Sequence, residues 1–156
     1  MRRLLSIAIL SLAVTTTVTF AADNALGTWK LNLEKTKSSP APNPVKILIV
    51  TREASDGAVK VTVKGERADG AVINASYTAI YGGVEVPVTG NAPYDMVLLK
   101  QTDADTFTEK RRKAGGSYKT SGITVISDGG KVMTVTVRGT NTDGSPLAAV
   151  CVLDKQ

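Results

Sequence analysis

Two stretches of similar pattern, Val59-Lys-Val-Thr-Val-Lys64 and Met133-Thr-Val-Thr-Val-Arg138, decide the fold class of this chain. Each alternates apolar and polar residues with a period of two, which is typical of a strand with one face on a core and the other in water. Valine, threonine and isoleucine, the residues that strands favour, are abundant around both stretches. The sequence therefore predicts an all-β protein.

Pairs of turn-forming residues separate the apolar runs at regular intervals. Asp-Gly and Gly-Gly supply the positive φ angles that tight β-hairpins need, so successive strands are expected to be antiparallel. Six such pairs occur: Asp56-Gly57, Asp69-Gly70, Gly82-Gly83, Gly115-Gly116, Asp128-Gly129 and Asp143-Gly144. We expect an up-and-down meander of about eight to ten strands, drawn from residues 27–32, 45–54, 58–66, 71–81, 84–88, 95–101, 105–112, 117–126, 131–140 and 146–154.

No stretch beyond the N-terminal segment shows a helical period. Residues 33–39 could form one helical turn, which the proline-rich run of residues 40–44 would stop. A long open antiparallel sheet leaves two exposed edges, so the meander is expected to close into a barrel, with a sandwich as the alternative.

An internal echo links the two alternating stretches. Ser55-Asp-Gly57 leads to Val61-Thr-Val-Lys-Gly65, and Ser127-Asp-Gly129 leads to Val135-Thr-Val-Arg-Gly139. A duplicated three-strand unit would explain this, and so would the independent choice of similar residues by similar hairpins. Both explanations stay open at this point.

The N-terminus has the layout of a secretory signal peptide. Arg2 and Arg3 precede an apolar run from Leu4 to Val14, and a small-residue cleavage site ends at Ala21, with Ala22 as the alternative. The apolar run is about 11 residues long, too short for a membrane span of roughly 20. We predict a signal peptide over residues 1–21, a single β-barrel domain over residues 22–156, and a periplasmic or secreted location.

Composition excludes most catalytic classes. The chain has no histidine, which removes Ser-His-Asp and Cys-His catalysis and the commonest metal ligand. Its one cysteine, Cys151, cannot form an internal disulfide and lies in an apolar run, where a buried small hydrophobe is favoured over a reactive thiol. We therefore expect no enzymatic activity, no cofactor and no metal site.

The net charge points to no polyanionic partner. The chain has 19 Lys and Arg against 14 Asp and Glu, and removal of Arg2 and Arg3 leaves 17 against 14, or about +3. We expect no nucleic-acid partner, no stable membrane insertion, and a monomer.

The segment Gly27-Thr-Trp29-Lys-Leu-Asn32 resembles the opening motif of the lipocalins and the wider calycin group. Together with Tyr81-Gly-Gly and Val86-Pro-Val-Thr-Gly-Asn91, it is similar to a group of exported bacterial lipocalin-like proteins of uncharacterised function. The resemblance implies that Trp29 closes the barrel floor under a basic residue, which Arg138 or Lys155 could supply.

Three aromatic residues are the candidate ligand contacts. Tyr77 and Tyr81 lie four apart on one expected strand and so face the same side, with small alanines between them. Trp29 is first a core residue and only secondarily a ligand contact. The leading hypothesis is a barrel that binds a small, largely apolar molecule. The alternative is a non-enzymatic interaction or envelope-structural module whose barrel core is filled.

Charged residues offer a weaker signal. The basic run of residues 110–113 reads as a solvated hairpin end, with contact to an anionic surface as the functional alternative. Strand alternation would place Lys110 and Arg112 on one side and Arg111 and Lys113 on the other. The strand carboxylates Glu66, Glu85 and Glu109 could act as an acid–base pair only if two of them met, and no pattern brings any two together.

Overall fold

A computed structural model describes residues 23–156, and the predicted signal peptide lies outside this range. All regular structure in the described part is strand, in agreement with the predicted all-β class. The twelve strands are β1 (Gly27–Leu31), β2 (Lys37–Ser39), β3 (Val45–Ser55), β4 (Ala58–Arg67), β5 (Val72–Ala79), β6 (Gly82–Pro87), β7 (Thr89–Gly90), β8 (Met96–Gln101), β9 (Thr106–Arg112), β10 (Lys119–Ser127), β11 (Val132–Thr140) and β12 (Pro146–Lys155).

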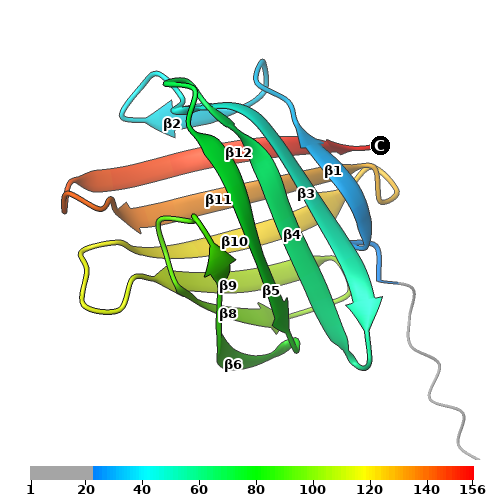
Figure 1. The fold of residues 1–156 in the computed structure, drawn as a ribbon. Coiled ribbons are helices and arrows are strands. Elements are labelled where there is room, and N and C mark those ends of the chain that lie inside the picture. The colour runs from blue at the N-terminus through cyan, green and yellow to red at the C-terminus, as the bar shows by residue number, and fades with distance from the viewer. Residues whose placement is uncertain (1–22) are drawn as a thin grey trace, which may run out of the picture.

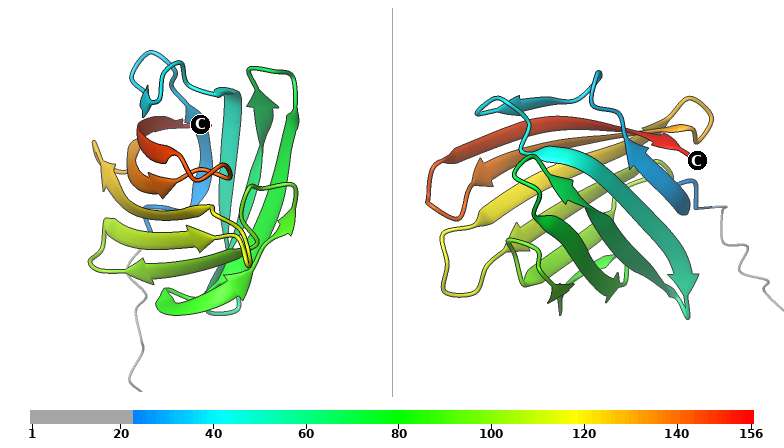
Figure 2. Two further views of the ribbon diagram at one scale, coloured as in Figure 1. Left: turned by 90° about the vertical axis from the view of Figure 1, so that its left-hand side faces the viewer. Right: turned by 45° about the horizontal axis from the view of Figure 1, so that its top comes forward.

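The strands form one antiparallel sheet that curls into a nearly closed barrel (Figure 1). The sheet runs in the order β6-β8-β9-β10-β11-β12-β1-β3-β4-β5-β7. The C-terminal strand β12 therefore pairs with the N-terminal strand β1. Strands β3–β5 make one wall, which faces the wall of β8–β12 in both further views (Figure 2). The predicted antiparallel barrel is confirmed, and its form is consistent with a lipocalin-like barrel.

A single bent segment joins the two remaining edges of the sheet. Its first half, β6, pairs with β8, and its second half, β7, pairs with β5 through Ala75–Gly90 and Ser76–Thr89. Because Val88 alone separates the two halves, the segment bridges the gap between β5 and β8. Each edge therefore has a partner, which is how small barrels avoid exposed strand edges.

The predicted strands agree with ten of the observed strands to within about three residues at each end. The expectation of a helical turn over residues 33–39 is wrong. Residues 33–35 form a turn, and Lys37–Ser39 then form the short strand β2. The reason is tertiary: Ala148–Val150 of β12 offer an unpaired edge beyond the end of β1, and β2 pairs with it.

The two halves of the sequence echo occupy equivalent positions. Asp56 and Asp128 open the β3–β4 and β10–β11 hairpins with φ angles of 43° and 53°. A Cβ atom on Gly65 would lie 2.0 Å from the Ile47 carbonyl oxygen, and one on Gly139 would lie 2.0 Å from the Lys119 carbonyl oxygen. The same residue type thus allows the same close approach of strands in both three-strand units.

The hydrophobic core fills the end of the barrel where β1 begins. Trp29 and Phe107 are completely buried there, and Ala25, just before β1, covers this end from the N-terminal side. Leu99, Val59 and Val97 are the other large side chains with almost no exposure. Within residues 23–156, no helix is long and apolar enough to span a membrane.

Candidate functional site

Trp29 forms the floor of the barrel. Its indole Nε1 donates a hydrogen bond to the Ala25 carbonyl oxygen at 2.9 Å, which satisfies the one polar atom of the ring. The ammonium of Lys155 lies 5.0 Å from the ring centroid, a cation–π arrangement. Lys155 is therefore the basic partner that the sequence left open, while Arg138 is exposed on β11.

A chain of polar groups crosses the interior beyond this floor. Glu109 and Arg111 of β9 point inward with Phe107, because strand alternation puts every second residue on one face. Arg111 Nη2 lies 2.6 Å from Glu109 Oε1. The Tyr77 hydroxyl of β5 donates to Glu109 Oε2 at 3.3 Å, which links the two walls of the barrel.

Two more tyrosines complete this cluster. The guanidinium of Arg111 lies 5.0 Å from the Tyr94 ring centroid, and Tyr94 stacks on Tyr118 with ring centroids 5.8 Å apart. Burial, with the nearby Glu109 charge, raises the pKa of Tyr77 well above its usual value. Burial likewise raises the pKa of Tyr94. Both phenols therefore stay protonated at neutral pH and can donate hydrogen bonds.

A second polar group lies nearer the floor. Arg52 of β3 is buried, and its Nη2 donates to the Tyr81 hydroxyl at 3.4 Å. The Tyr81 hydroxyl donates in turn to the carboxylate of Asp23. Phe107 lies against both residues: its ring centroid is 5.1 Å from the Arg52 guanidinium carbon and 5.1 Å from the Tyr81 ring centroid. The Phe107 ring thus separates the side chains of Arg52 and Tyr81 from the rest of the core.

The three predicted ligand contacts therefore share one core. Trp29 and Tyr77 are buried in the hydrophobic cluster, and Tyr81 packs against it from just beyond the end of β5. Tyr77 and Tyr81 do face the same side, but they belong to different polar groups. Contact between these residues and a ligand stays a prediction.

The interpretation of residues 110–113 as a solvated hairpin end is wrong for Arg111. Lys110 and Arg112 do face outward, and Arg112 pairs with Glu85 of β6, with Nη2 to Oε2 at 2.5 Å. Arg111 points into the barrel, as the alternation of β9 requires. The sequence does contain a signal for this position. Arg111 follows Phe107 by four residues, so strand alternation puts both side chains on the same face.

The strand carboxylates do not meet as an acid–base pair. Glu66 pairs with Lys46, Glu85 with Arg112, and Glu109 with Arg111. Among the residues that the structure describes, no three cysteine, aspartate or glutamate side chains are grouped so that they could hold a metal ion. Cys151 is partly exposed and packs against the core, where burial raises the pKa of its thiol.

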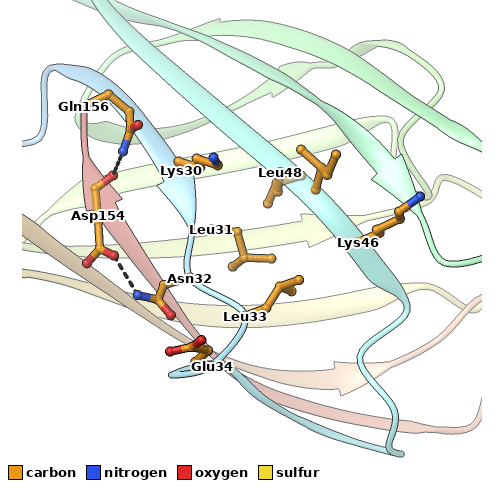
Figure 3. Close-up of a pocket in the computed structure, with 10 residues that line it drawn as sticks. Lys30, Leu31, Asn32, Leu33, Glu34, Lys46, Leu48, Asp154 and Gln156 are labelled. Atoms are coloured by element: carbon orange, nitrogen blue, oxygen red, sulfur yellow. Dashed lines mark hydrogen bonds between the residues drawn. The ribbon is translucent and has the colours of Figure 1, made fainter.

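A surface groove of about 550 Å³ lies between β1 and β3, and Figure 3 shows the residues that line it. It exists because β1 pairs with β3 only over residues 27–30 and 49–52, so the first part of β3 diverges from β1. Leu31 is buried at the base, and Leu48 packs on the core beside it. Leu33 and Ile47 are 47% and 43% exposed along the groove.

The rim of the groove is polar and carries side chains of both charges. Two lysines and two carboxylates line it, together with two amide side chains: Lys30, Lys46, Glu34, Asp154, Asn32 and Gln156. Asp154 is held in place by Asn32, whose Nδ2 donates to its carboxylate at 2.7 Å (Figure 3). The groove therefore offers a small molecule an apolar base and a larger number of polar side chains.

No family model matches the chain, and no curated protein matches it either. Among solved structures, EF1p2_mFAP2b bound to DFHBI is similar with a TM-score of 0.50 and 14% identity, over 87% of this chain and 97% of that one. The redesigned β-barrel mFAP1 bound to DFHBI has a TM-score of 0.45 at 14% identity, over 85% of this chain and 95% of that one. The first similarity shows the fold of this chain and no more.

Proposed function

We propose that this protein is an exported, non-enzymatic, lipocalin-like barrel that binds a small, largely apolar molecule in the groove between β1 and β3. The groove itself carries the proposal, although none of Trp29, Tyr77 and Tyr81 lines it. Its volume of about 550 Å³ lies within the roughly 300–1,000 Å³ of typical small-molecule sites.

The position of the groove also supports binding. Leu31 and Leu48 belong to the buried side of the barrel, whereas Leu33 and Ile47 remain in contact with water. A bound molecule would therefore remove exposed leucine and isoleucine surface from water without opening the core. The ladder of β3 with β4 supports the groove's outer wall at Ile47 and Leu48, beside a register shift between Val45 and Ile47.

A solved barrel of similar fold gives a precedent for small-molecule binding, because EF1p2_mFAP2b holds DFHBI. A barrel of this general form is therefore compatible with a bound small molecule. The ligand of the present chain, and its location outside the cytoplasm, are proposals drawn from the groove and the N-terminal sequence.

The test is a titration with Nile red, an uncharged apolar dye whose fluorescence rises in apolar surroundings. Wild-type protein is expected to bind the dye saturably. Ile47→Gln removes exposed apolar surface from the groove and should weaken binding about fivefold, which corresponds to roughly 1 kcal/mol. Native mass spectrometry of protein purified from its own periplasm or medium would then look for a co-purifying molecule.

The matched control is Ile123→Gln on β10, because Ile123 is 51% exposed on the outer face of the barrel. This variant should bind the dye as the wild type does. The proposal is contradicted if Ile47→Gln has wild-type affinity, or if both variants weaken binding equally.

The second candidate is an interaction module that uses the outer face of β10–β12. Ile123, Val125 and Val150 are each at least 38% exposed, and the register places Ile123 and Val150 on either side of Thr136. This group of apolar residues on neighbouring strands favours a protein contact. If Ile123→Gln alone abolished dye binding, or if it dissociated an oligomer seen by light scattering, this candidate would replace the first.

A further inference from the structure

Arg52 is a buried cation without a carboxylate partner. The residue is 6% exposed, and no Asp or Glu oxygen of the described residues forms an ion pair with it within 4.0 Å. Its Nε is buried and has no hydrogen-bond partner. The one hydrogen bond of the side chain runs from Nη2 to Tyr81 at 3.4 Å, which is long.

Such an arrangement is costly to a folded protein. A buried guanidinium loses its water, and a neutral phenol with one aromatic face restores only part of that loss. Arg111 shares a buried Nε without a partner but differs in its charge balance, because its guanidinium lies 2.6 Å from a carboxylate oxygen of Glu109. Methionine or leucine would fill the position of Arg52 at lower cost, so packing gives no reason for an arginine there.

The carboxylate of Asp23 lies near Arg52 but forms no ion pair with it. Asp23 accepts hydrogen bonds from the Tyr81 hydroxyl and from the Ala25 backbone N–H, the latter at 2.9 Å. Tyr81 lies between the guanidinium of Arg52 and this carboxylate. Asp23 and Tyr81 are both partly exposed, so this is the side from which a solute would reach the arginine.

We propose that Arg52 is an anion-binding residue, and that its ligand is the carboxylate group of a small monoanion. One carboxylate oxygen would accept from Nε and the other from an Nη atom, the bidentate geometry that arginine favours. Tyr81 and Asp23 would move aside as a unit, which would free the face of the buried Phe107 ring that Tyr81 now covers for an apolar or aromatic body. Arg52 carries one unpaired positive charge, so the ligand is expected to carry one negative charge.

This site is separate from the groove of the proposed function. The groove is lined by β3 residues 46–48, whereas Arg52 lies further along the same strand and faces the Trp29 end. The inference does not rest on the groove, and each can fail without the other. Ile47→Gln is therefore expected to leave carboxylate binding unchanged.

The experiment follows the Nε–H signal of Arg52 by nitrogen-15 NMR during titration with benzoate. Benzamide, the uncharged analogue of the same shape, is the control ligand, and Arg52→Met identifies the signal by its loss. Benzoate is expected to shift the Arg52 signal saturably, and benzamide is expected to leave it in place. Asp23→Asn removes the competing internal carboxylate and should tighten benzoate binding at least threefold.

Arg52→Met should bind no benzoate and should be at least as resistant to thermal unfolding as the ligand-free wild type. The proposal is overturned if benzoate leaves the Arg52 signal of the wild type unmoved up to high concentration. It is also overturned if benzamide shifts that signal equally, or if Asp23→Asn weakens benzoate binding. The benzoate affinity of Asp23→Asn can be read from any protein signal that benzoate shifts, so this comparison stands even if Arg52→Met fails to fold.

Discussion

Glu109 and Arg111 form an ion pair of 2.6 Å inside the barrel, although Arg111 belongs to the most basic run of the chain. The Glu109 side chain is only 8% exposed, and that of Arg111 is 25% exposed. Their neighbour Arg112 pairs with Glu85 on the outside of the same strand. One strand thus carries two ion pairs that differ chiefly in burial, which makes the cost of burial directly measurable.

Glu109→Gln should destabilise the protein by about 3 kcal/mol, because it leaves the buried Arg111 charge without its counter-ion. The amide keeps an acceptor for the Tyr77 hydroxyl, so the loss reports the charge rather than the hydrogen bond. Urea unfolding at neutral pH measures the change in the free energy of unfolding.

The control for this prediction is Glu85→Gln in the exposed pair, which should change stability little because water screens both charges. The double variant Glu109→Gln/Arg111→Met should recover part of the loss, since it removes the unpaired charge. Equal effects of Glu109→Gln and Glu85→Gln would show that burial of the inner pair has no energetic consequence.

Stability should fall as the pH rises above about 10. Burial raises the pKa of Tyr81 from 10.0 to about 12. Between these values the unfolded chain has lost the phenolic proton while the folded protein keeps it, so deprotonation favours unfolding. The contribution of Tyr81 is fully present below pH 10 and is lost as the pH rises through about 12.

Urea unfolding at several pH values across this window, with tyrosinate absorbance followed in parallel, tests the alkaline prediction. Tyr81→Phe cannot ionise at this position, so its stability should decline less steeply than that of the wild type. Tyr77, whose pKa is also raised by burial, remains in both proteins and cancels in the comparison. Identical slopes for the two proteins would argue against a raised Tyr81 pKa.

Lys155→Gln should cost about 0.5–1 kcal/mol, because it removes a cation from an exposed position over the Trp29 ring. The ammonium also donates to the Asn24 carbonyl oxygen at 3.2 Å, so the chain just before β1 loses one attachment. Thermal unfolding followed by Trp29 fluorescence measures both effects, since Trp29 is the single tryptophan.

Arg138→Gln is the matched control for the cation over Trp29. Arg138 is the other basic residue that the lipocalin resemblance allowed, and it is exposed on β11 away from the ring. Its replacement should leave the fluorescence and the unfolding temperature unchanged. An unfolding temperature of Lys155→Gln equal to those of the wild type and of Arg138→Gln would mean that the contact over the indole contributes nothing to stability.

Most of the barrel was predictable because strand alternation is local information. Residues 58–66 were expected as a strand and the structure has Ala58–Arg67, since Val, Lys and Thr alternate there without interruption. The same rule separates Arg111 from Lys110 and Arg112, and the structure has Arg111 on the inward face with Phe107. The interpretation of residues 110–113 as a solvated hairpin end gave their charge more weight than the alternation. In the structure, the pairing of β9 with β10 fixes which face each residue occupies, and Arg111 lies inside.

The groove and β2 were not predictable from local pattern. The groove depends on where β1 stops pairing with β3, which is a matter of register between strands separated by a turn and a proline-rich loop. β2 depends on the free edge of β12 at residues 148–150. Neither pairing can be recognised from the residues of the segment itself. Both depend on how distant strands are arranged in the sheet.

Gly65→Ala and Gly139→Ala should each destabilise the protein by about 2 kcal/mol or more. A methyl group at either position would lie 2.0 Å from a backbone carbonyl oxygen on the neighbouring strand, so the strands would have to separate. Gly122→Ala is the control, because its Cβ would have no neighbour nearer than 3.5 Å. Urea unfolding should show two similar losses and almost no change for the control. A large loss at only one of the two glycines would show that the two positions are not equivalent in the fold, although the sequence echo aligns them and each has the same 2.0 Å approach.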